Sequence, residues 1–286
     1  MSFYPPRKFT LSFELFPPKT PAGEEGMYAS VRELMAFKPD VITCTYGAGG
    51  STRDKTLEIT SQVKQRFGVR VASHLTCVGS TVGQLETYLS EAQARGIDNI
   101  VALRGDPPKG ESAFQPVEGG FRYASELVAF IHQQFPKFGM AVAGYPETHQ
   151  EAVSPQADLE NLKRKVDAGG GVVITQLFYS NADFFRFSEE CRKLGIRAPI
   201  VPGILPVTNL SQIQRITSLC KARLPEAFLA ELAQRDDADW QFRVGVDYAT
   251  RQVQELIDAG VPGIHFYVLN KSSATSSVLQ AVKRPA

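Results

Sequence analysis

The chain has 286 residues, of which 43% are hydrophobic and 21% are charged, and its 31 basic and 30 acidic residues leave a net charge of +1. This balance provides no basic surface for nucleic acid or an anionic membrane, and no apolar run is long enough to span a bilayer. The N-terminal MSFYPPRKFT lacks the apolar core of a secretory signal, and the four scattered cysteines form no CxxC pair. We therefore expect a soluble, cytoplasmic protein without nucleic-acid or membrane partners.

Short apolar, β-branched runs alternate with longer amphipathic stretches along the whole chain. The runs predicted as strands are 10–16, 40–46, 69–77, 99–104, 140–145, 171–179, 199–205 and 263–269. Helical patterns fill the gaps, as in 83–96 and 157–170, and a glycine closes each of these two. The longest gap, between the seventh and eighth strands, is predicted to hold an extra helix at 225–234 before the last barrel helix at 239–259.

Strands that alternate with helices indicate parallel βαβ units. Eight such units, beginning with a strand, predict a single (β/α)8 barrel, the TIM barrel of the α/β class, over residues 1–286, because no linker, repeat or low-complexity segment interrupts the chain. An open doubly wound sheet is the alternative, but that fold usually places a glycine-rich phosphate loop after its first strand. Here the first strand ends in Phe16, Pro17 and Pro18, which cannot cradle a pyrophosphate.

Barrel enzymes place their chemistry at the carboxyl ends of the strands. The predicted strands end in more hydrogen-bonding side chains than stability requires. These residues are Glu14, Thr45, Tyr46, His74, Arg104, Gly105, Asp106, Tyr145, Gln176, Asn270 and Lys271. The sequence therefore predicts an active site at this end of the barrel.

Glu14 lies on the strand face that we expect to point into the barrel. Side chains alternate along a strand, so Ser12 and Glu14 share one face, whereas Leu11, Phe13 and Leu15 share the other and should pack on helices. A carboxyl group at the edge of a barrel core loses water, so we expect its pKa to rise, as suits a general acid near neutral pH. A structural hydrogen-bond acceptor is an equally open interpretation at this point.

Two charged features are ambiguous by themselves. Arg104 and Asp106 form either an ion pair at the barrel rim or a charged contact to a cofactor, with Gly105 allowing a close backbone approach. Asp158 and Lys165 lie along one face of helix 157–170, which is usually a solvated arrangement. The segment YPETH before this helix adds further polar side chains nearby, so a binding face stays possible.

The remaining motifs give little functional information by themselves. The glycine-rich segment 45–54 is neither GxGxxG nor a P-loop, and alone it indicates only a βα loop. No HExxH or other metal-ligand spacing is present, so no metal is expected. His132, on a helix, and His265, in a strand, are interpreted as structural.

Nine short strings occur in order between residues 12 and 270: SFELFPPK, TCTYGAGGSTRD, ASHLTC, ALRGDPP, YPETHQEA, DLENLKRKVDAGG, ITQLF, PGILPVTN and HFYVLN. Together they closely resemble the catalytic barrel of the methylenetetrahydrofolate reductase family. The resemblance covers nearly the whole chain. It implies the compact bacterial form, without the C-terminal regulatory domain that eukaryotic relatives carry.

The resemblance implies a flavoprotein that binds FAD at the carboxyl end of the barrel without a Rossmann domain. NADH or NADPH reduces the flavin and leaves, and methylenetetrahydrofolate then takes its place and is reduced to 5-methyltetrahydrofolate. In this ping-pong scheme Glu14 matches the general acid that opens the substrate ring. Asp106 matches a carboxylate near flavin and pterin, whose charge favours the iminium cation. A homo-oligomer, either a dimer or a tetramer, is expected from the resemblance alone.

The resemblance also assigns binding positions. Those that match FAD contacts are Thr45, His74, Arg104, Gly105, Asp106, Tyr123, Ala124, Tyr145, His149, Asp158, Asn161, Arg164 and Lys165. Those that match nicotinamide contacts are Tyr46 and Ala48, and those that match the substrate are Glu14, Asp106, Gln176, Gln212 and Lys271.

Two positions depart from the family pattern. Lys271 stands where the bacterial enzyme has an arginine, and lysine cannot form the same bidentate fork. Ile216 replaces an aromatic residue that stacks on ligands, and isoleucine cannot stack. We expect recognition of the substrate tail, and affinity for nicotinamide or folate, to be weaker as a result.

Two other functions remain open. A flavin-free pterin-binding barrel, such as a methyltransferase, would give a colourless protein. A non-catalytic folate-binding subunit would lose nothing measurable when Glu14 is replaced by glutamine. A Schiff-base aldolase is conceivable for Lys271, but no other residue supports it.

Overall fold

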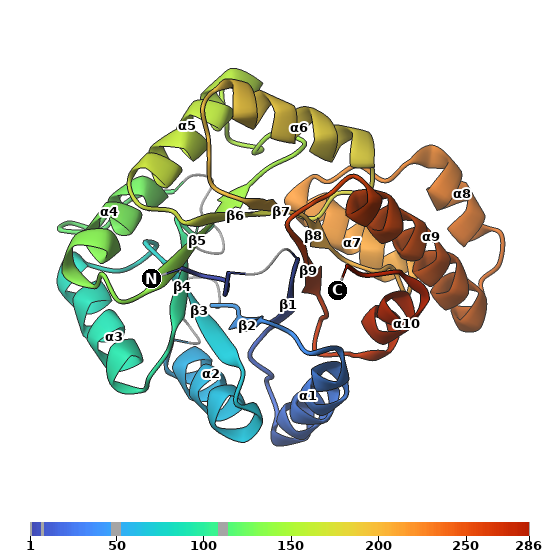
Figure 1. The fold of residues 1–286 in the computed structure, drawn as a ribbon, viewed down its shortest axis with the longest axis horizontal. Coiled ribbons are helices and arrows are strands. Elements are labelled where there is room, and N and C mark those ends of the chain that lie inside the picture. Colours follow the sequence, from blue (N-terminus) through green and yellow to red (C-terminus); the bar gives the residue numbers. More distant parts are fainter. Residues whose placement is uncertain (1, 7–8, 47–52, 108–113, 286) are drawn as a thin grey trace.

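The computed structural model describes residues 2–6, 9–46, 53–107 and 114–285. In Figure 1 the strands form an inner ring and the helices surround it. The strands are β1 (Thr10–Leu15), β2 (Val41–Cys44), β3 (Arg70–Thr76), β4 (Asn99–Leu103), β5 (Gly139–Gly144), β6 (Val172–Thr175), β7 (Ile200–Val201), β8 (Gly203–Ile204) and β9 (Gly263–Tyr267). The helices are α1 (Pro21–Leu34), the short 3-10 helix η1 (Met35–Phe37), α2 (Arg53–Phe67), α3 (Val82–Ala94), α4 (Ala124–Gln134), α5 (Pro155–Asp167), α6 (Asn181–Lys193), α7 (Leu210–Cys220), α8 (Glu226–Ala233), α9 (Ala238–Asp258) and α10 (Ser273–Ala281).

The seventh predicted strand is divided in two. The paired strands run in the order β7-β6-β5-β4-β3-β2-β1-β9-β8, and every pair is parallel. β7 and β8 lie on either side of Pro202, and they pair with β6 and β9 respectively. Proline has no N–H for a ladder, but the carbonyl of Pro202 accepts a hydrogen bond from His265 N at 3.0 Å. The ring closes through this divided strand, and the predicted (β/α)8 barrel is confirmed.

The long connection between β8 and β9 holds more helix than the sequence analysis assigned. The predicted extra helix 225–234 corresponds to α8, and the predicted last barrel helix 239–259 corresponds to α9. α7 is an additional helix that was not predicted; the side chain of Asn209 caps it by accepting a hydrogen bond from Gln212 N. These three helices lie together at one side of the barrel in Figure 1. They share a separate apolar cluster that includes Ile213, Phe228 and Leu232.

Local sequence signals set the ends of helices α3 and α5. Thr81 begins α3 with a capping box, and Ser154 caps α5, with Pro155 at its first position. Gly96 (φ 73°) and Gly169 (φ 125°) follow the last turns and adopt the left-handed backbone that glycine permits. The predicted glycine stops are therefore confirmed.

The side chains on the two faces of β1 point in the directions that the two-residue alternation predicts. Leu11, Phe13 and Leu15 join the large apolar cluster shared with the helices. The barrel interior holds a separate cluster at the amino ends of the strands, built by Phe3, Tyr4, Val41, Ala72, Val101, Ala141, Val172, Ile174 and Val201. Figure 1 shows the N-terminal segment crossing the middle of the ring. Residues 3–4, here called the N-terminal plug, thus close the amino end of the barrel.

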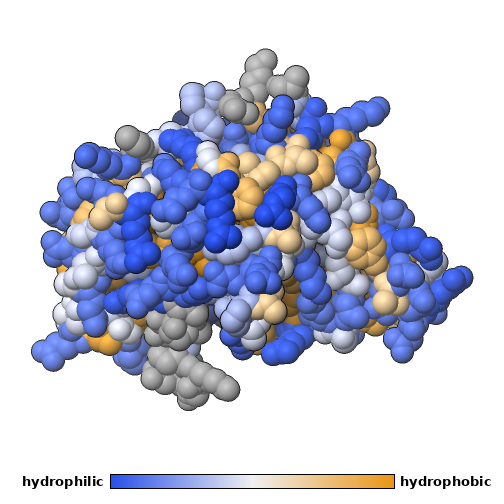
Figure 2. Space-filling view, turned by 90° about the horizontal axis from the view of Figure 1, so that it is seen from below, coloured by the Kyte–Doolittle hydropathy of each residue, from blue (hydrophilic) through white to orange (hydrophobic). Residues whose placement is uncertain are grey.

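The surface of the described residues is largely polar. The face seen in Figure 2 is mostly hydrophilic, with small and separate hydrophobic areas. Within the described ranges, no helix is long and apolar enough to cross a membrane.

Candidate active site

A cavity of about 850 Å³ opens at the carboxyl ends of the strands. The residues that the sequence analysis assigned to the site and that line this cavity are Glu14, Thr45, Tyr46, His74, Arg104, Gly105, Asp106, Tyr123, Ala124, Tyr145, His149, Asp158, Asn161, Arg164, Lys165 and Gln176. The fold thus collects them around one space, although their contacts with ligands remain predictions.

Three assigned residues are not among those that line the cavity. Ala48 lies outside the described residues. Gln212 is in the first turn of α7, where its side-chain oxygen accepts a hydrogen bond from Thr208 Oγ1 at 3.3 Å. Lys271 is exposed in the turn after β9. The roles of Gln212 and Lys271 therefore stay predictions that the lining of this cavity does not support.

Glu14, at the end of β1, is held by two histidines. Its Oε2 accepts a hydrogen bond from His265 Nε2 at 3.3 Å. His74 Nε2 lies 3.2 Å from the same oxygen, at ion-pair distance but without hydrogen-bond geometry. Burial alone would raise the pKa of Glu14, but the electrostatic attraction of His74 and the hydrogen bond from His265 outweigh it and lower the pKa from 4.5 to about 2.

The expectation of a raised Glu14 pKa is therefore wrong for the ligand-free site. The loss of water on which that expectation depended is present, because the Glu14 side chain is only 15% exposed. The compensating histidines come from β3 and β9, far away along the chain, and their convergence on one oxygen depends on barrel closure. Glu14 is a carboxylate at neutral pH in this state.

His265 belongs to the site, although its sequence position suggested only a structural role. Its strand neighbours Ile264 and Phe266 pack outward in the helix-facing cluster, so His265 points inward. Its Nδ1 lies 2.8 Å from Ser12 Oγ, which lies 2.7 Å from the hydroxyl of Tyr4. The signal that could have found it is the same two-residue alternation that placed Glu14 inside the barrel.

Arg104 makes its ion pair with a residue that the sequence analysis did not consider. Its guanidinium donates two hydrogen bonds to Glu151, at 2.6 and 2.8 Å, and this carboxylate raises the pKa of Arg104. Asp106 is exposed at the rim. Gly105 has φ +90°, and a Cβ there would lie 2.6 Å from Val78 Cγ1. Glycine is therefore required here both by its backbone conformation and by the close wall of the cavity.

One face of α5 lines the cavity instead of facing solvent. The ammonium of Lys165 donates to the carbonyl of Ala143 at 2.6 Å. Burial lowers the pKa of Lys165 to about 8, against the opposing charge of Asp158. Asp158 accepts a hydrogen bond from the backbone N–H of His149 at 2.9 Å. The solvated-face interpretation of this helix therefore does not describe these two side chains.

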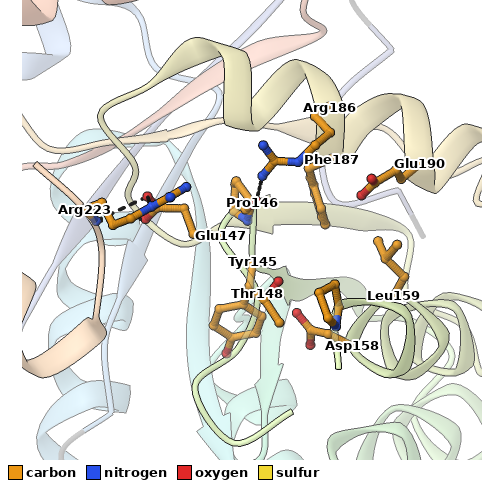
Figure 3. Close-up of a pocket in the computed structure, with 11 residues that line it drawn as sticks. Tyr145, Pro146, Glu147, Thr148, Asp158, Leu159, Arg186, Phe187, Glu190 and Arg223 are labelled. Atoms are coloured by element: carbon orange, nitrogen blue, oxygen red, sulfur yellow. Dashed lines mark hydrogen bonds and ion pairs between the residues drawn. The ribbon is translucent and has the colours of Figure 1, made fainter. Parts of the chain in front are cut away.

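A second pocket, of about 550 Å³, lies between segment 145–149, α5 and α6 (Figure 3). Arg223, from the connection between α7 and α8, reaches Glu147 and Asp183 with 3.1 Å contacts. Arg186 is also paired with Asp183 and donates to the carbonyl of Pro146. These bonds tie the α7–α8 connection to the segment that carries Tyr145.

Within the described ranges, no group of three or more histidine, cysteine, aspartate or glutamate side chains could hold a metal ion. The cavity is instead lined by cations and hydrogen-bonding groups. Such a set can bind a phosphorylated organic ligand, and Glu14 with its histidines can hold or move a proton.

Comparison with known families gives one match over nearly the whole chain. The model of the methylenetetrahydrofolate reductase family matches residues 4–283. Methylenetetrahydrofolate reductase (NADH) 1 of Arabidopsis thaliana is 39% identical over 279 residues, which are 94% of this chain and 47% of the relative. 5,10-Methylenetetrahydrofolate reductase of Escherichia coli is 39% identical over 273 residues, which are 95% of this chain and 90% of the relative. The chain thus spans about half the length of its plant relatives.

Two solved structures share the architecture at 10% sequence identity. A Clostridium thermocellum protein that binds two copies of 5-methyl-5,6,7,8-tetrahydrofolic acid has a TM-score of 0.59 and covers 96% of this chain and 93% of its own. Oxaloacetate acetylhydrolase in complex with 3,3-difluorooxalacetate has a TM-score of 0.53 and covers 96% of this chain and 79% of its own. At this identity the two structures support the fold alone.

Proposed function

This chain belongs to the methylenetetrahydrofolate reductase family, and we propose that it reduces 5,10-methylenetetrahydrofolate to 5-methyltetrahydrofolate, with NADH or NADPH as electron donor and FAD as bound cofactor. The names of its relatives support the folate substrate, and those of the plant relatives support NADH. The structural neighbour that binds 5-methyltetrahydrofolic acid is consistent with a folate ligand. The observation that carries the proposal is a buried carboxylate, Glu14, held by two histidines at a cavity with cationic walls.

The residues of the cavity fit a flavin dinucleotide. Ligand pockets span about 300–1,000 Å³, and this cavity lies within that range. Thr76 Oγ1 is buried in its wall without a hydrogen-bond partner among the described residues. Arg164 and Lys165 would hold the pyrophosphate, and Gly105 would let the backbone approach the ring. When bound, the flavin supplies hydride transfer between the nicotinamide and the one-carbon unit.

The chain itself must supply a proton, because the leaving nitrogen of the substrate ring has to be protonated before the ring opens. Glu14 delivers this proton to that nitrogen. Because its pKa is low in the ligand-free site, Glu14 is a carboxylate there and must take up a proton before it can deliver one.

Two further side chains act on the substrate. Asp106, at the exposed rim of the cavity, stabilises the cation that ring opening generates. Gln176 fixes its amide by accepting a hydrogen bond from the backbone N–H of Leu177 at 2.9 Å. The NH2 group of this amide then binds the folate and the nicotinamide in turn.

The absorbance spectrum of the purified protein tests the proposed function. We expect a yellow protein whose flavin band is bleached by NADH or NADPH under anaerobic conditions and restored by methylenetetrahydrofolate. A colourless protein that binds folate would support the flavin-free barrel instead. A yellow protein whose reduced flavin is not reoxidised by the folate would rule out the proposed substrate.

A further inference from the structure

Glu151 belongs to the string YPETHQEA, but the sequence analysis assigned it no role. It follows Tyr145 and His149 along the chain, and it lines the large cavity together with both of them and with Arg104. A hydrogen bond from Arg104 lowers the pKa of Glu151, so this side chain is a carboxylate at neutral pH. A negative charge therefore stands in the wall of the proposed flavin site.

The backbone of Glu151 determines how the ring of His149 is protonated. The N–H of Glu151 donates to His149 Nδ1 at 3.1 Å. A backbone N–H can only donate, so Nδ1 must be the acceptor and carries no proton. In a neutral imidazole the ring N–H then lies on Nε2. Burial and the charge of Arg104 lower the pKa of His149, which supports the neutral ring at neutral pH.

The turn that carries both residues is anchored on two sides. Ala152 N donates to His149 O at 2.9 Å and closes the turn. His149 N donates to Asp158 Oδ2 at 2.9 Å and ties the turn to α5. The His149 ring also packs edge-on against the ring of Tyr145, with the two centroids 4.6 Å apart. The fold therefore fixes where Glu151 stands in the cavity wall.

The carboxylate of Glu151 holds the guanidinium of Arg104 in one plane. Two parallel contacts, 2.6 Å from Nη1 and 2.8 Å from Nη2, form a bidentate pair. Arg104 Nε donates to the carbonyl of Gly105 at 3.2 Å. Within the described part of the chain, three of the five guanidinium N–H groups are thus used, which leaves two for an acceptor in the cavity. Because the ion pair is neutral as a whole, it suits a neutral acceptor, such as a ring carbonyl or a ribityl hydroxyl of a flavin, better than a phosphate.

We propose that Glu151 is a positioning residue of the flavin site: its carboxylate orients Arg104 and its backbone N–H orients His149, so that both donate to neutral acceptor atoms of the flavin. This inference rests on the proposed function, in which FAD occupies the cavity. Arg104 follows β4 and His149 precedes α5, and Glu151 contacts both of them. One residue therefore sets the spacing of two donors in the cavity wall.

The affinity of the flavin-free protein for FAD, measured by flavin fluorescence, tests the role of the carboxylate. Glu151→Gln should bind FAD about tenfold more weakly, the scale of one lost charge-assisted hydrogen bond. Glu151→Asp keeps the charge but is one methylene shorter, so it cannot hold Arg104 in the same place and should also bind FAD more weakly. Wild-type affinity in Glu151→Asp would show that only the charge matters. Tighter binding by Glu151→Gln would show that Glu151 competes with the flavin for Arg104, and either result overturns the proposal.

A double-mutant cycle separates positioning from a general loss of structure. Arg104→Gln removes the group that Glu151 holds, so the addition of Glu151→Gln to this variant should weaken FAD binding no further. An equal, about tenfold loss in the wild-type and Arg104→Gln backgrounds would mean that Glu151 acts without Arg104, and it would contradict the positioning role.

Glu189→Gln is the matched control, because Glu189 forms another bidentate pair, with Arg192 on α6, and does not line the cavity. It should leave the affinity for FAD unchanged. In denaturant unfolding of the flavin-free protein, Glu151→Gln and Glu189→Gln should both shift the midpoint only slightly, because both ion pairs are partly exposed. Equal losses of FAD affinity in the two variants would contradict a specific role of Glu151.

Nitrogen-15 NMR of the histidine rings tests the backbone contact without any flavin. The chain has four histidines, and a His149→Gln variant assigns the signals of the ring in question. We expect an unprotonated Nδ1 and a protonated Nε2 at neutral pH, both in the wild-type protein and in Glu151→Gln, which keeps the backbone N–H. A His149 that is protonated at Nδ1 overturns the proposal. If the protein binds no FAD, the proposed function fails, whereas the NMR measurement still decides whether Glu151 orients His149.

Discussion

The two ends of the barrel interior differ in how their polar groups are satisfied. At the amino end, the buried Tyr4 hydroxyl and Ser12 Oγ bond to each other, and the Tyr4 ring packs edge-on against Phe3. At the carboxyl end, His74 Nε2 and Thr76 Oγ1 are buried without hydrogen-bond partners among the described residues. An unpaired buried polar atom costs free energy. Asn99 Oδ1, beside Phe3 at the amino end, is unpaired among the described residues as well, but it is closed off from solvent. The comparison teaches that the carboxyl end differs because the residues that carry its unpaired atoms, His74 and Thr76, line a cavity that a ligand can enter.

The largest expected effect comes from the group that faces the open end. Glu14→Gln should slow reoxidation of the flavin by methylenetetrahydrofolate by about 10²–10⁴-fold, the usual contribution of a general acid. Flavin reduction by NADH should survive, because hydride transfer to the flavin does not use this proton. Stopped-flow absorbance measures both rates. Glu160→Gln, on the exposed side of α5, is the control, and unchanged folate reduction in Glu14→Gln would remove Glu14 from the mechanism.

The closed end should respond through stability instead of catalysis. Phe3 is 1% exposed. Its backbone packs so closely on Gly139 that a Cβ at residue 139 would lie 2.7 Å from the Phe3 Cα. Phe3→Ala should lower the free energy of unfolding by about 3–5 kcal/mol, as for other large buried aromatic residues. Denaturant unfolding measures the loss, and Leu219→Ala, at a 69% exposed position, should change it little. A Phe3→Ala protein of unchanged stability would show that the plug does not close the barrel.

A smaller effect should come from Lys165, whose ammonium is present below about pH 8 and is lost as the pH rises through that value. Wild-type affinity for FAD should therefore fall above about pH 8. Lys165→Gln should bind FAD about tenfold more weakly at neutral pH, because one charge-assisted contact is lost. The affinity of this variant for FAD should not fall above about pH 8. Flavin fluorescence titration measures both.

Lys163→Gln provides the matched comparison for Lys165, because Lys163 lies on the same helix and pairs with Asp167 on the exposed side. It should retain wild-type affinity and pH dependence. The stability of the ligand-free wild-type protein should change with pH in the opposite direction: it should rise as the pH increases above about 8, where the affinity for FAD falls. Because folding lowers the Lys165 pKa, the cost of burying its charge is full below about pH 8 and is relieved as the pH rises toward the unfolded value of 10.5. Equal effects of the two substitutions would contradict the cavity-facing role of Lys165.

Local patterns predicted much of the fold and the position of the site. The two-residue alternation in β1 placed Leu11, Phe13 and Leu15 against the helices and Glu14 inside. Reading the strand ends gathered most of the candidate residues that line the cavity. α7 was missed, and the seventh strand was predicted whole because the division at Pro202 depends on pairing with two different neighbours.

The sequence by itself determined which residues could meet at the carboxyl end of the barrel, because strand alternation, helix capping and chain order are local or topological properties. Only the tertiary structure decided their partners and charge states. Glu151 reaches Arg104 from 47 residues away, and His265 reaches Glu14 from 251 residues away. Coulomb energies and hydrogen bonds depend on separations of a few ångströms, and barrel closure sets those separations. For that reason strand alternation predicted that Glu14 faces the barrel interior, where it lines the cavity, but the predicted direction of its pKa shift was wrong.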